Sequence, residues 1–169
     1  MSLSMYQASV PVFVQHLTGL SGVLDKAAAH AAARKIEPAT LLTMRLYPDM
    51  YTTARQVRAA TDHAMSAGRL AGVELPKLPE DDSSFEGLKA RIAAAIAFLN
   101  TLKPAQVDGT EEKEITIPMG SNTRAFKGQQ LLLGFSLPNF FFHATTAYAV
   151  LRHAGVEIGK RDFMGARPS

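Results

Sequence analysis

Apolar residues recur at intervals of three and four along the N-terminal part of the chain, and this pattern limits what the chain can fold into. Val10, Phe13, Leu17, Leu20 and Leu24 belong to it. Such spacing places side chains on one face of an α helix, because the helix completes a turn every 3.6 residues. A helix with one apolar face must bury it against other elements. The segment from about Met5 to Lys35 therefore predicts a helix that packs in a bundle.

Three later segments repeat this spacing. They cover about residues 51–71, 83–103 and 128–153. Ser83 and Glu86 form the S-x-x-E pattern typical of a helix start. Pro138 predicts a kink or a split in the last segment, and Gly155 is well placed to end it. Four amphipathic helices predict an all-α (mainly) fold, a four-helix bundle.

One region between the third and fourth helical segments has the pattern of β structure. Residues 114–117 alternate polar and apolar side chains, residues 124–127 do the same, and the turn-rich residues 118–122 lie between them. This arrangement predicts one inserted β-hairpin. A lone hairpin is marginally stable in water, so we expect it to pack on the helices. Residues 1–169 as a whole are the size of a single domain.

The 169-residue chain contains no cysteine. This excludes disulfides, thiolate metal sites and cysteine nucleophiles. It also fits a reducing compartment. The first residues lack the basic start and apolar run of a signal peptide, so we expect a cytoplasmic protein.

Two classes of partner are disfavoured by the distribution of charge. Residues 131–151 carry no charge and are long enough to span a bilayer, but Ser136, Asn139 and His143 make the segment too polar for lipid. We therefore expect a helix buried among other helices and no membrane partner. The net charge is +3, yet the basic residues are spread along the chain without an aromatic-interleaved basic run, which argues against nucleic acid.

Several blocks of sequence resemble a known group of proteins. They are residues 4–11 (SMYQASVP), 45–50 (RLYPDM), 54–57 (ARQV), 137–143 (LPNFFFH) and 155–163 (GVEIGKRDF). Over nearly the whole chain, the sequence resembles an uncharacterised bacterial domain-of-unknown-function family of the DinB/YfiT-like helical-bundle superfamily. The resemblance implies a bundle with up-down-down-up topology, often a homodimer, and it implies no known activity.

The wider superfamily has a metal site made of one histidine on the second helix and an H-x-x-x-H pair on the last. In this chain His143 falls on the second histidine of the pair, Asn139 on the first, and Gln56 near the position on the second helix. Carboxamides are weaker ligands than imidazole for zinc or nickel. We therefore expect a degenerate site without a metal or other cofactor. Gln56, Asn139 and His143 would contact a small polar ligand, with His143 as the candidate catalytic acid-base group. The alternative is a buried His143 that bonds to Gln56 or to a carbonyl for structural reasons.

Arg45, Asp49 and Arg55 form a second candidate set. In one interpretation the arginines bind an anion at the mouth of a pocket. In the other, Asp49 caps the second helix and forms a structural ion pair with Arg45 or Arg55. Two other histidines receive a structural interpretation: His63 lies about two turns from Gln56 and is expected to be exposed, and His16 is expected on a polar face.

Two hypotheses of function follow. The first is a small-ligand-binding or stress-related dimeric module that kept the fold and lost the metal. The second is an enzyme of hydrolase or thiol-transferase type that uses His143 in the pocket between helices, with or without a metal. The second rests on analogy between folds. An open pocket beside His143, with Gln56 and Asn139 pointing into it, would favour it.

Overall fold

The predicted N-terminal stripe forms the helix α1 (Met5–Arg34) in the computed structural model, which describes residues 3–165. Ser4 caps this helix, because its side chain accepts a hydrogen bond from the backbone N–H of Gln7. Phe13, Leu17 and Leu24 are completely buried. The periodicity of the sequence therefore identified the face of α1 that packs in the core.

The second helical segment is divided rather than continuous. After the short helix α2 (Pro38–Thr43), helix α3 (Thr53–Ala64) is followed by α4 (Ser66–Ala71), with Met65 between them. The backbone N–H of Gly68 donates to the carbonyl of Met65, an i to i−3 bond that marks a tighter turn at this point. The prediction of one uninterrupted helix over this segment was therefore wrong.

The third segment forms α5 (Phe85–Leu99), followed by the short α6 (Pro104–Val107). The cap is Ser84, whose side chain accepts a hydrogen bond of 2.9 Å from the N–H of Gly87. Ser83, which the sequence pattern favoured, donates instead to Asp81 at 2.7 Å. The helix therefore begins one residue later than its S-x-x-E pattern predicts.

The predicted hairpin is present as β1 (Glu114–Met119) and β2 (Asn122–Lys127), which pair antiparallel. Ile115 stands opposite Phe126. Ile115 and Ile117 are both buried, each with 7% of its surface exposed. The apolar positions of the alternating pattern thus face the helices, as a hairpin of marginal stability requires.

The last segment changes from π-helical to α-helical turns next to Pro138, where a kink or a split was predicted, and the helix continues without a gap. The π-helix η1 (Gln130–Ser136) comes first, and α7 (Leu137–His153) follows with Pro138 in its first turn, where a missing N–H is tolerated. Gly155 ends α7 in a backbone conformation with φ of 91°, which favours glycine. In the described part of the chain, no helix is both long and apolar enough to cross a bilayer.

The C-terminal region contains a short helix, α8 (Lys160–Met164), that the sequence did not predict. As expected, Phe163 ties this region to the body of the protein, since its ring lies 5.9 Å from that of Tyr148. The last four residues of the predicted tail, 166–169, lie outside the described residues.

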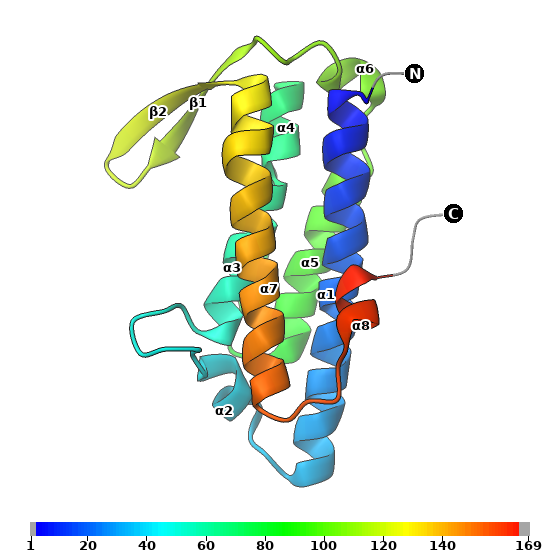
Figure 1. Ribbon diagram of the computed structural model, residues 1–169, viewed down its shortest axis with the longest axis vertical. Coiled ribbons are helices and arrows are strands. Elements are labelled where there is room, and N and C mark those ends of the chain that lie inside the picture. Colours follow the sequence, from blue (N-terminus) through cyan, green and yellow to red (C-terminus); the bar gives the residue numbers. More distant parts are fainter. Residues whose placement is uncertain (1–2, 166–169) are drawn as a thin grey trace.

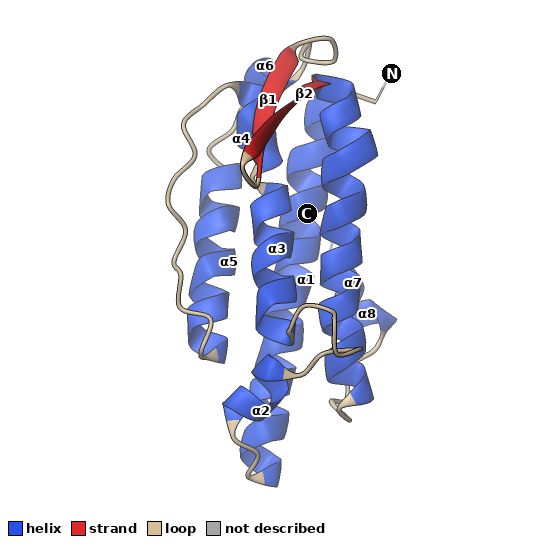
Figure 2. Ribbon diagram, turned by 90° about the vertical axis from the view of Figure 1, so that its left-hand side faces the viewer, coloured by secondary structure: helices blue, strands red, loops and turns tan. Residues whose placement is uncertain are grey.

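The long helices run in the order that the resemblance implied (Figures 1 and 2). α1 descends, α3 and α4 ascend, α5 ascends again, and α7 descends, which is the up-down-down-up arrangement seen from the other end. A loop over residues 72–84 runs down the outside of the bundle and allows α5 to lie parallel to α3. α3 packs mainly on α7, and α1 mainly on α5. The predicted mainly helical bundle with one inserted hairpin is confirmed.

Candidate functional site

Where α3 packs on α7, Gln56 and His143 form a hydrogen bond. Nδ1 of His143 lies 2.6 Å from Oε1 of Gln56, and Nε2 of Gln56 lies 3.4 Å from the carbonyl oxygen of Tyr51. Because the amide nitrogen faces a carbonyl, the amide oxygen must face the imidazole, and Nδ1 of His143 therefore carries the proton. In this tautomer Nε2 of His143 keeps a free lone pair, so the imidazole can accept a proton or a hydrogen bond there.

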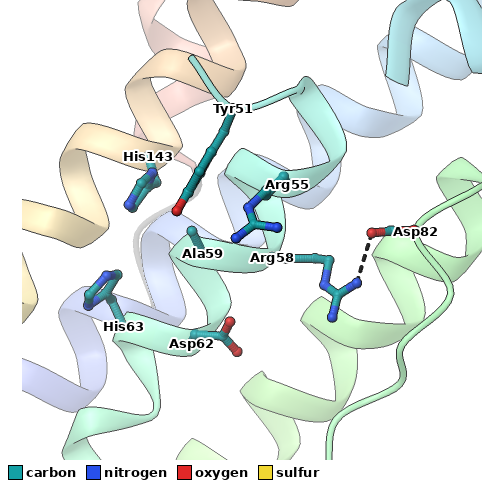
Figure 3. A pocket seen from close by; sticks show the side chains of 8 residues that line it. All are labelled: Tyr51, Arg55, Arg58, Ala59, Asp62, His63, Asp82 and His143. Atoms are coloured by element: carbon teal, nitrogen blue, oxygen red, sulfur yellow. Dashed lines mark hydrogen bonds and ion pairs between the residues drawn. The ribbon is translucent and has the colours of Figure 1, made fainter. Parts of the chain in front are cut away.

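Three rings lie nearly parallel beside this hydrogen bond (Figure 3). The ring of His143 stacks with that of Tyr51 at 5.9 Å between centroids and with that of His63 at 5.6 Å. His63 is half-buried and also contacts Phe135, with 5.4 Å between the ring centroids. The expectation of an exposed His63 was therefore wrong. Gln56 and His63 do lie two turns apart on α3, but His143 comes from α7 and contacts both.

The surroundings keep both imidazoles neutral. Partial burial lowers the pKa of His143 to about 4, with a smaller contribution from the nearby His63. Burial also lowers the pKa of His63, while the negative charge of Asp62 acts in the opposite direction. At neutral pH the site therefore offers hydrogen-bonding imidazoles without their positive charge.

A pocket of about 320 Å³ opens beside these rings. Its lining comprises Tyr51, Arg55, Arg58, Ala59, Asp62, His63, Asp82 and His143. Apart from Asp82 and His143, these residues come from α3 and the residue pair that leads into it. A local cap explains how this helix starts, since the Thr52 side chain accepts a hydrogen bond of 3.2 Å from the N–H of Arg55.

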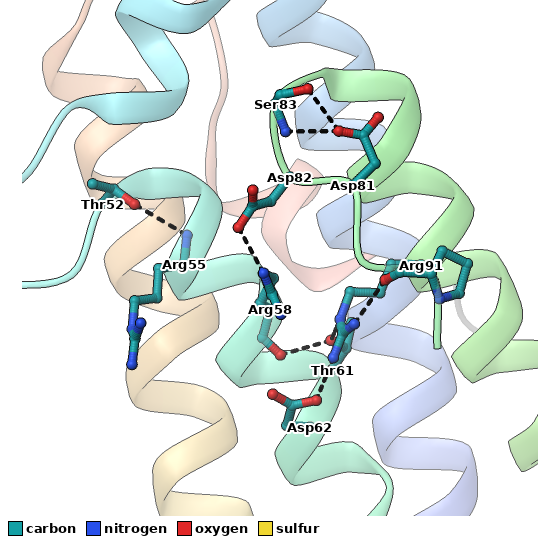
Figure 4. Close-up of polar contacts among 10 residues, drawn as sticks. Thr52, Arg55, Arg58, Thr61, Asp62, Asp81, Asp82, Ser83 and Arg91 are labelled. Carbon is teal, nitrogen blue, oxygen red and sulfur yellow. Dashed lines mark hydrogen bonds and ion pairs between the residues drawn. The ribbon is translucent and has the colours of Figure 1, made fainter. Parts of the chain in front are cut away.

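Three of the four charged residues that line the pocket form ion pairs with a side chain of opposite charge, and Arg55 does not in the described part of the chain (Figure 4). Arg58 donates to Asp82 at 2.8 Å, and this bond raises the pKa of Arg58. Asp62 forms an ion pair with Arg91 of α5. Arg55 has no carboxylate partner within residues 3–165, and its guanidinium lies 4.3 Å above the ring of Tyr51. One positive charge is thus left to face the pocket, which suits an anion.

Arg91 is itself a buried residue that joins three segments. Its Nε donates to the hydroxyl of Thr61 and its Nη1 to the carbonyl of Pro79, each at 2.7 Å. Its side chain is 7% exposed, whereas that of Asp62 is 60% exposed. The guanidinium therefore has its hydrogen-bonding needs met away from solvent, and Asp62 spans the boundary between this network and the pocket.

Four of the six sequence-predicted site residues do not line the pocket, and Gln56 is one of them although it contacts His143. Nδ2 of Asn139 donates to the carbonyl of Phe135 at 2.7 Å, one turn earlier in the chain, so Asn139 does not join Gln56 and His143. Arg45 donates to the carbonyl of Met50 and Asp49 is exposed. The cap of α3 is Thr52, which corrects the expectation for Asp49. Arg55 alone of the second candidate set lines the pocket.

Sequence reasoning missed Tyr51, Arg58, Asp62 and His63. A signal was present in the spacing along α3. Arg55, Arg58 and Asp62 are separated by three and four residues, which places them on one face of the helix, and Gln56 and His63 are separated by seven. Arg58 and Asp82 are separated by 24 positions, and nothing in the sequence indicates that they pair.

The comparisons with known proteins agree with the fold. The model of a family described as a domain of unknown function, DUF1993, matches residues 5–164. The chain belongs to the DUF1993 family. The match extends from the start of α1 to the end of α8, so it includes both helices of the site.

This DUF1993 chain is also similar to a DinB family member from Shewanella denitrificans, known from a crystal structure. The two share 35% sequence identity with a TM-score of 0.86, over 97% of this chain and 93% of the other. The resemblance to uncharacterised DinB-like proteins is therefore confirmed. No protein with a curated description matches the chain.

The metal site implied by the DinB resemblance does not fit the residues of this DUF1993 chain. At its three positions, the amide of Asn139 bonds to the backbone, and the amide of Gln56 bonds to His143 and to the Tyr51 carbonyl. Among residues 3–165, no group of three or more His, Cys, Asp or Glu side chains is arranged to hold a metal ion. The chemistry of the pocket is therefore determined by the arginine, carboxylate and imidazole side chains that line it.

Proposed function

We propose that this DUF1993 protein binds a small ligand that carries a carboxylate or phosphate group. The observation that carries the proposal is the unpaired guanidinium of Arg55, which lines a pocket together with the neutral rings of His63 and His143. The planar donors of arginine match the oxygens of a carboxylate or phosphate. Nε2 of His143 can take up a proton as the anion binds and then donate a hydrogen bond to it, which would orient the ligand in the pocket.

The protonation of His143 connects binding to pH. The pKa of His143 is about 4, and an anion placed beside this ring would raise it. Binding would then be accompanied by proton uptake, so the affinity should increase as the pH falls from neutrality toward the raised pKa.

The test uses acetate and inorganic phosphate as probes and the NMR signals of the imidazole rings as the readout. We expect saturable shifts of the His143 and His63 signals, with a dissociation constant that rises by about tenfold or more in Arg55→Gln. Arg152→Gln is the matched control, because Arg152 is exposed in the last turn of α7. Shifts that do not saturate, or that weaken equally in both variants, would contradict the proposal.

A second candidate is an enzyme of hydrolase or thiol-transferase type with His143 as the proton acceptor. Gln56 supports it, because it fixes the tautomer that an acceptor at Nε2 requires. With a pKa of about 4 the imidazole is a weak base, so the substrate itself would have to raise this pKa. Hydrolysis of para-nitrophenyl acetate tests this role. His143→Asn should remove the activity while keeping a donor to Gln56, and a rate equal to that of the wild type would exclude it.

The proposal has three further parts. They are the homodimer that the resemblance implies, a cytoplasmic location and a role in stress. Large side chains that stay exposed, including those of Leu46, Tyr47 and Phe142, support an interface. The absence of cysteine fits a reducing compartment. Light scattering during size-exclusion chromatography tests the dimer, and a monomeric mass at all concentrations would remove it from the proposal.

A further inference from the structure

A second pocket, of about 570 Å³, adjoins the first. It is lined by Tyr51, Asp62, His63, Ser66, Arg69, Ile117, Pro118, Met119, Gly120, Leu131, Phe135 and Ser136. Tyr51, Asp62 and His63 also line the first pocket, so the two spaces meet at these side chains. We call the first space the head pocket and the second the hairpin pocket, because residues 117–120 of the hairpin form one of its walls.

The two pockets differ in the chemistry of their walls. Four of the eight residues that line the head pocket are charged, whereas two of the twelve that line the hairpin pocket are charged, Asp62 and Arg69, and its apolar side chains come from two elements. Ile117 and Met119 come from β1, and Leu131 and Phe135 come from η1. A wall of this kind favours an alkyl or aromatic group over a second ionic group.

Ser66 and Ser136 add unmet hydrogen-bonding capacity to the hairpin pocket. The two residues are 5% and 1% exposed, and neither hydroxyl has a hydrogen-bond partner within residues 3–165. Several other helical hydroxyls of this chain donate to a carbonyl one turn earlier, as that of Thr61 does to Arg58 at 2.7 Å. Those of Ser9, Thr18, Thr43 and Thr146 do so at 2.7 or 2.8 Å. The two pocket serines depart from this habit, and a buried hydroxyl without a partner is unfavourable unless something else satisfies it.

The backbone at Ser136 is also unusual. This residue ends the π-helix η1, which supplies Leu131, Phe135 and Ser136 to the pocket. π-helical turns are rare and occur frequently at functional sites. The pocket thus combines an apolar wall, unpartnered hydroxyls and an uncommon backbone form at one place.

From these observations we infer that the ligand is an amphipathic acid. Its anionic group occupies the head pocket beside Arg55, and its apolar chain passes Tyr51 and His63 into the hairpin pocket. An oxygen on that chain, a hydroxyl or a carbonyl, bonds to Ser66 or Ser136. The inference rests on the proposed function, because it requires the anionic group to bind first in the head pocket.

The first experiment varies the length of the chain. Acetate, butanoate, hexanoate and octanoate are titrated into the full-length protein, with the imidazole NMR signals as the readout. Complete burial of a methylene would improve affinity by about fourfold, and we expect at least about tenfold between acetate and hexanoate. If acetate does not bind, the proposed function fails. If acetate binds and affinity does not increase with length, the amphipathic ligand is excluded while the head pocket survives.

Two residues of the same strand provide a matched pair of variants. Ile115 and Ile117 are equally buried, but only Ile117 lines the hairpin pocket. Ile117→Ala should weaken hexanoate binding by about threefold to tenfold and leave acetate binding unchanged. Ile115→Ala should change neither. Equal effects of the two variants on hexanoate would show that the hairpin acts only through stability, and the inference would be lost.

The serines are tested with hydroxylated probes. Hexanoate is compared with its monohydroxy derivatives in the wild type and in the double variant Ser66→Ala, Ser136→Ala. We expect at least one derivative to bind the wild type as tightly as hexanoate or more tightly, and the double variant to favour hexanoate. If every hydroxylated acid binds the wild type more weakly than hexanoate, the oxygen on the chain is excluded.

Discussion

His16 and His143 are both half-buried histidines, yet their surroundings differ. Burial lowers the pKa of both. The ring of His16 lies among aromatic side chains, 4.9 Å from Phe141 and 5.5 Å from Phe163, and its Nδ1 has no hydrogen-bond partner in the described chain. The ring of His143 bonds to Gln56 and faces a charged pocket.

The comparison teaches that a lowered pKa does not by itself identify a functional histidine. Desolvation produces the same direction of shift in an aromatic cluster and in a pocket. His143 is hydrogen-bonded to the side chain of Gln56 and adjoins a space that a ligand can enter. The hydrogen bond of His16 goes instead to the backbone of Phe163, and its ring lines neither the head pocket nor the hairpin pocket. The expectation that His16 lies on a polar face was wrong because α7 and α8 cover that side of α1 with aromatic residues.

The largest expected effect is a loss of stability on substitution of His16, which tests whether this histidine is purely structural. His16→Ala removes a ring from the cluster of Phe140, Phe141 and Phe163, and we expect the free energy of unfolding to fall by about 2 kcal/mol. The affinity for acetate should stay within about twofold of the wild type, because His16 does not line either pocket. Urea unfolding and the acetate titration measure the two quantities. A large loss of acetate affinity at unchanged stability would place His16 in the site and end the contrast.

A smaller effect is expected on the pH dependence of stability, because burial lowers the pKa of both histidines. The pKa of His143 is about 4 in the folded protein, against about 6.5 in an unfolded chain. As the pH falls between these values, the unfolded state takes up a proton that folded His143 does not, so stability present above pH 6.5 is lost toward pH 4. Because the ring is half exposed, this loss should be below about 2 kcal/mol.

The variant His143→Asn should therefore show a shallower decline of unfolding free energy on acidification than the wild type. His16→Phe should also flatten the decline, because the pKa of His16 is shifted in the same direction. Urea unfolding at several pH values between neutrality and the acid limit measures the slopes. Parallel slopes in all three proteins would mean that neither histidine is held neutral by the fold.

The smallest expected effect concerns His153, which lies neither in the aromatic cluster, as His16 does, nor beside the head pocket, as His143 does. His153 is exposed in the last turn of α7. His153→Ala should change the free energy of unfolding by less than about 0.5 kcal/mol, because surface substitutions have small effects. Acetate binding should not change. A loss comparable with that of His16→Ala would indicate that α7 is sensitive to any substitution, and the effect of His16 could no longer be assigned to its aromatic contacts.

The sequence was sufficient where structure depends on local pattern. The stripe from Val10 to Leu24 identified α1, alternation identified the hairpin, and Gly155 located the end of α7. Each of these features is decided by backbone geometry or by burial of one face. The family resemblance added the order of the helices, which periodicity alone does not fix.

The site was only partly predictable because it depends on contacts between elements. Gln56 and His143 were paired from the resemblance, whereas His63 was placed on the surface by reasoning within one helix. The resemblance placed Asn139 beside Gln56 and His143, whereas its amide donates to the backbone carbonyl of Phe135 one turn earlier, a local contact that competes with contacts between helices. The π-helical turns of η1 also have no signal in the apolar spacing.

The ion pair between Arg91 and Asp62 has a consequence for what the pocket can select. α5 contributes no side chain to the lining of the head pocket, yet Arg91 reaches Asp62 from that helix and offsets its negative charge. Arg55 is then left to determine the local electrostatic potential. The preference of the pocket for anions thus depends on Arg91, which does not line it. A substitution of Arg91 on α5 would change this preference without altering any side chain that contacts the ligand.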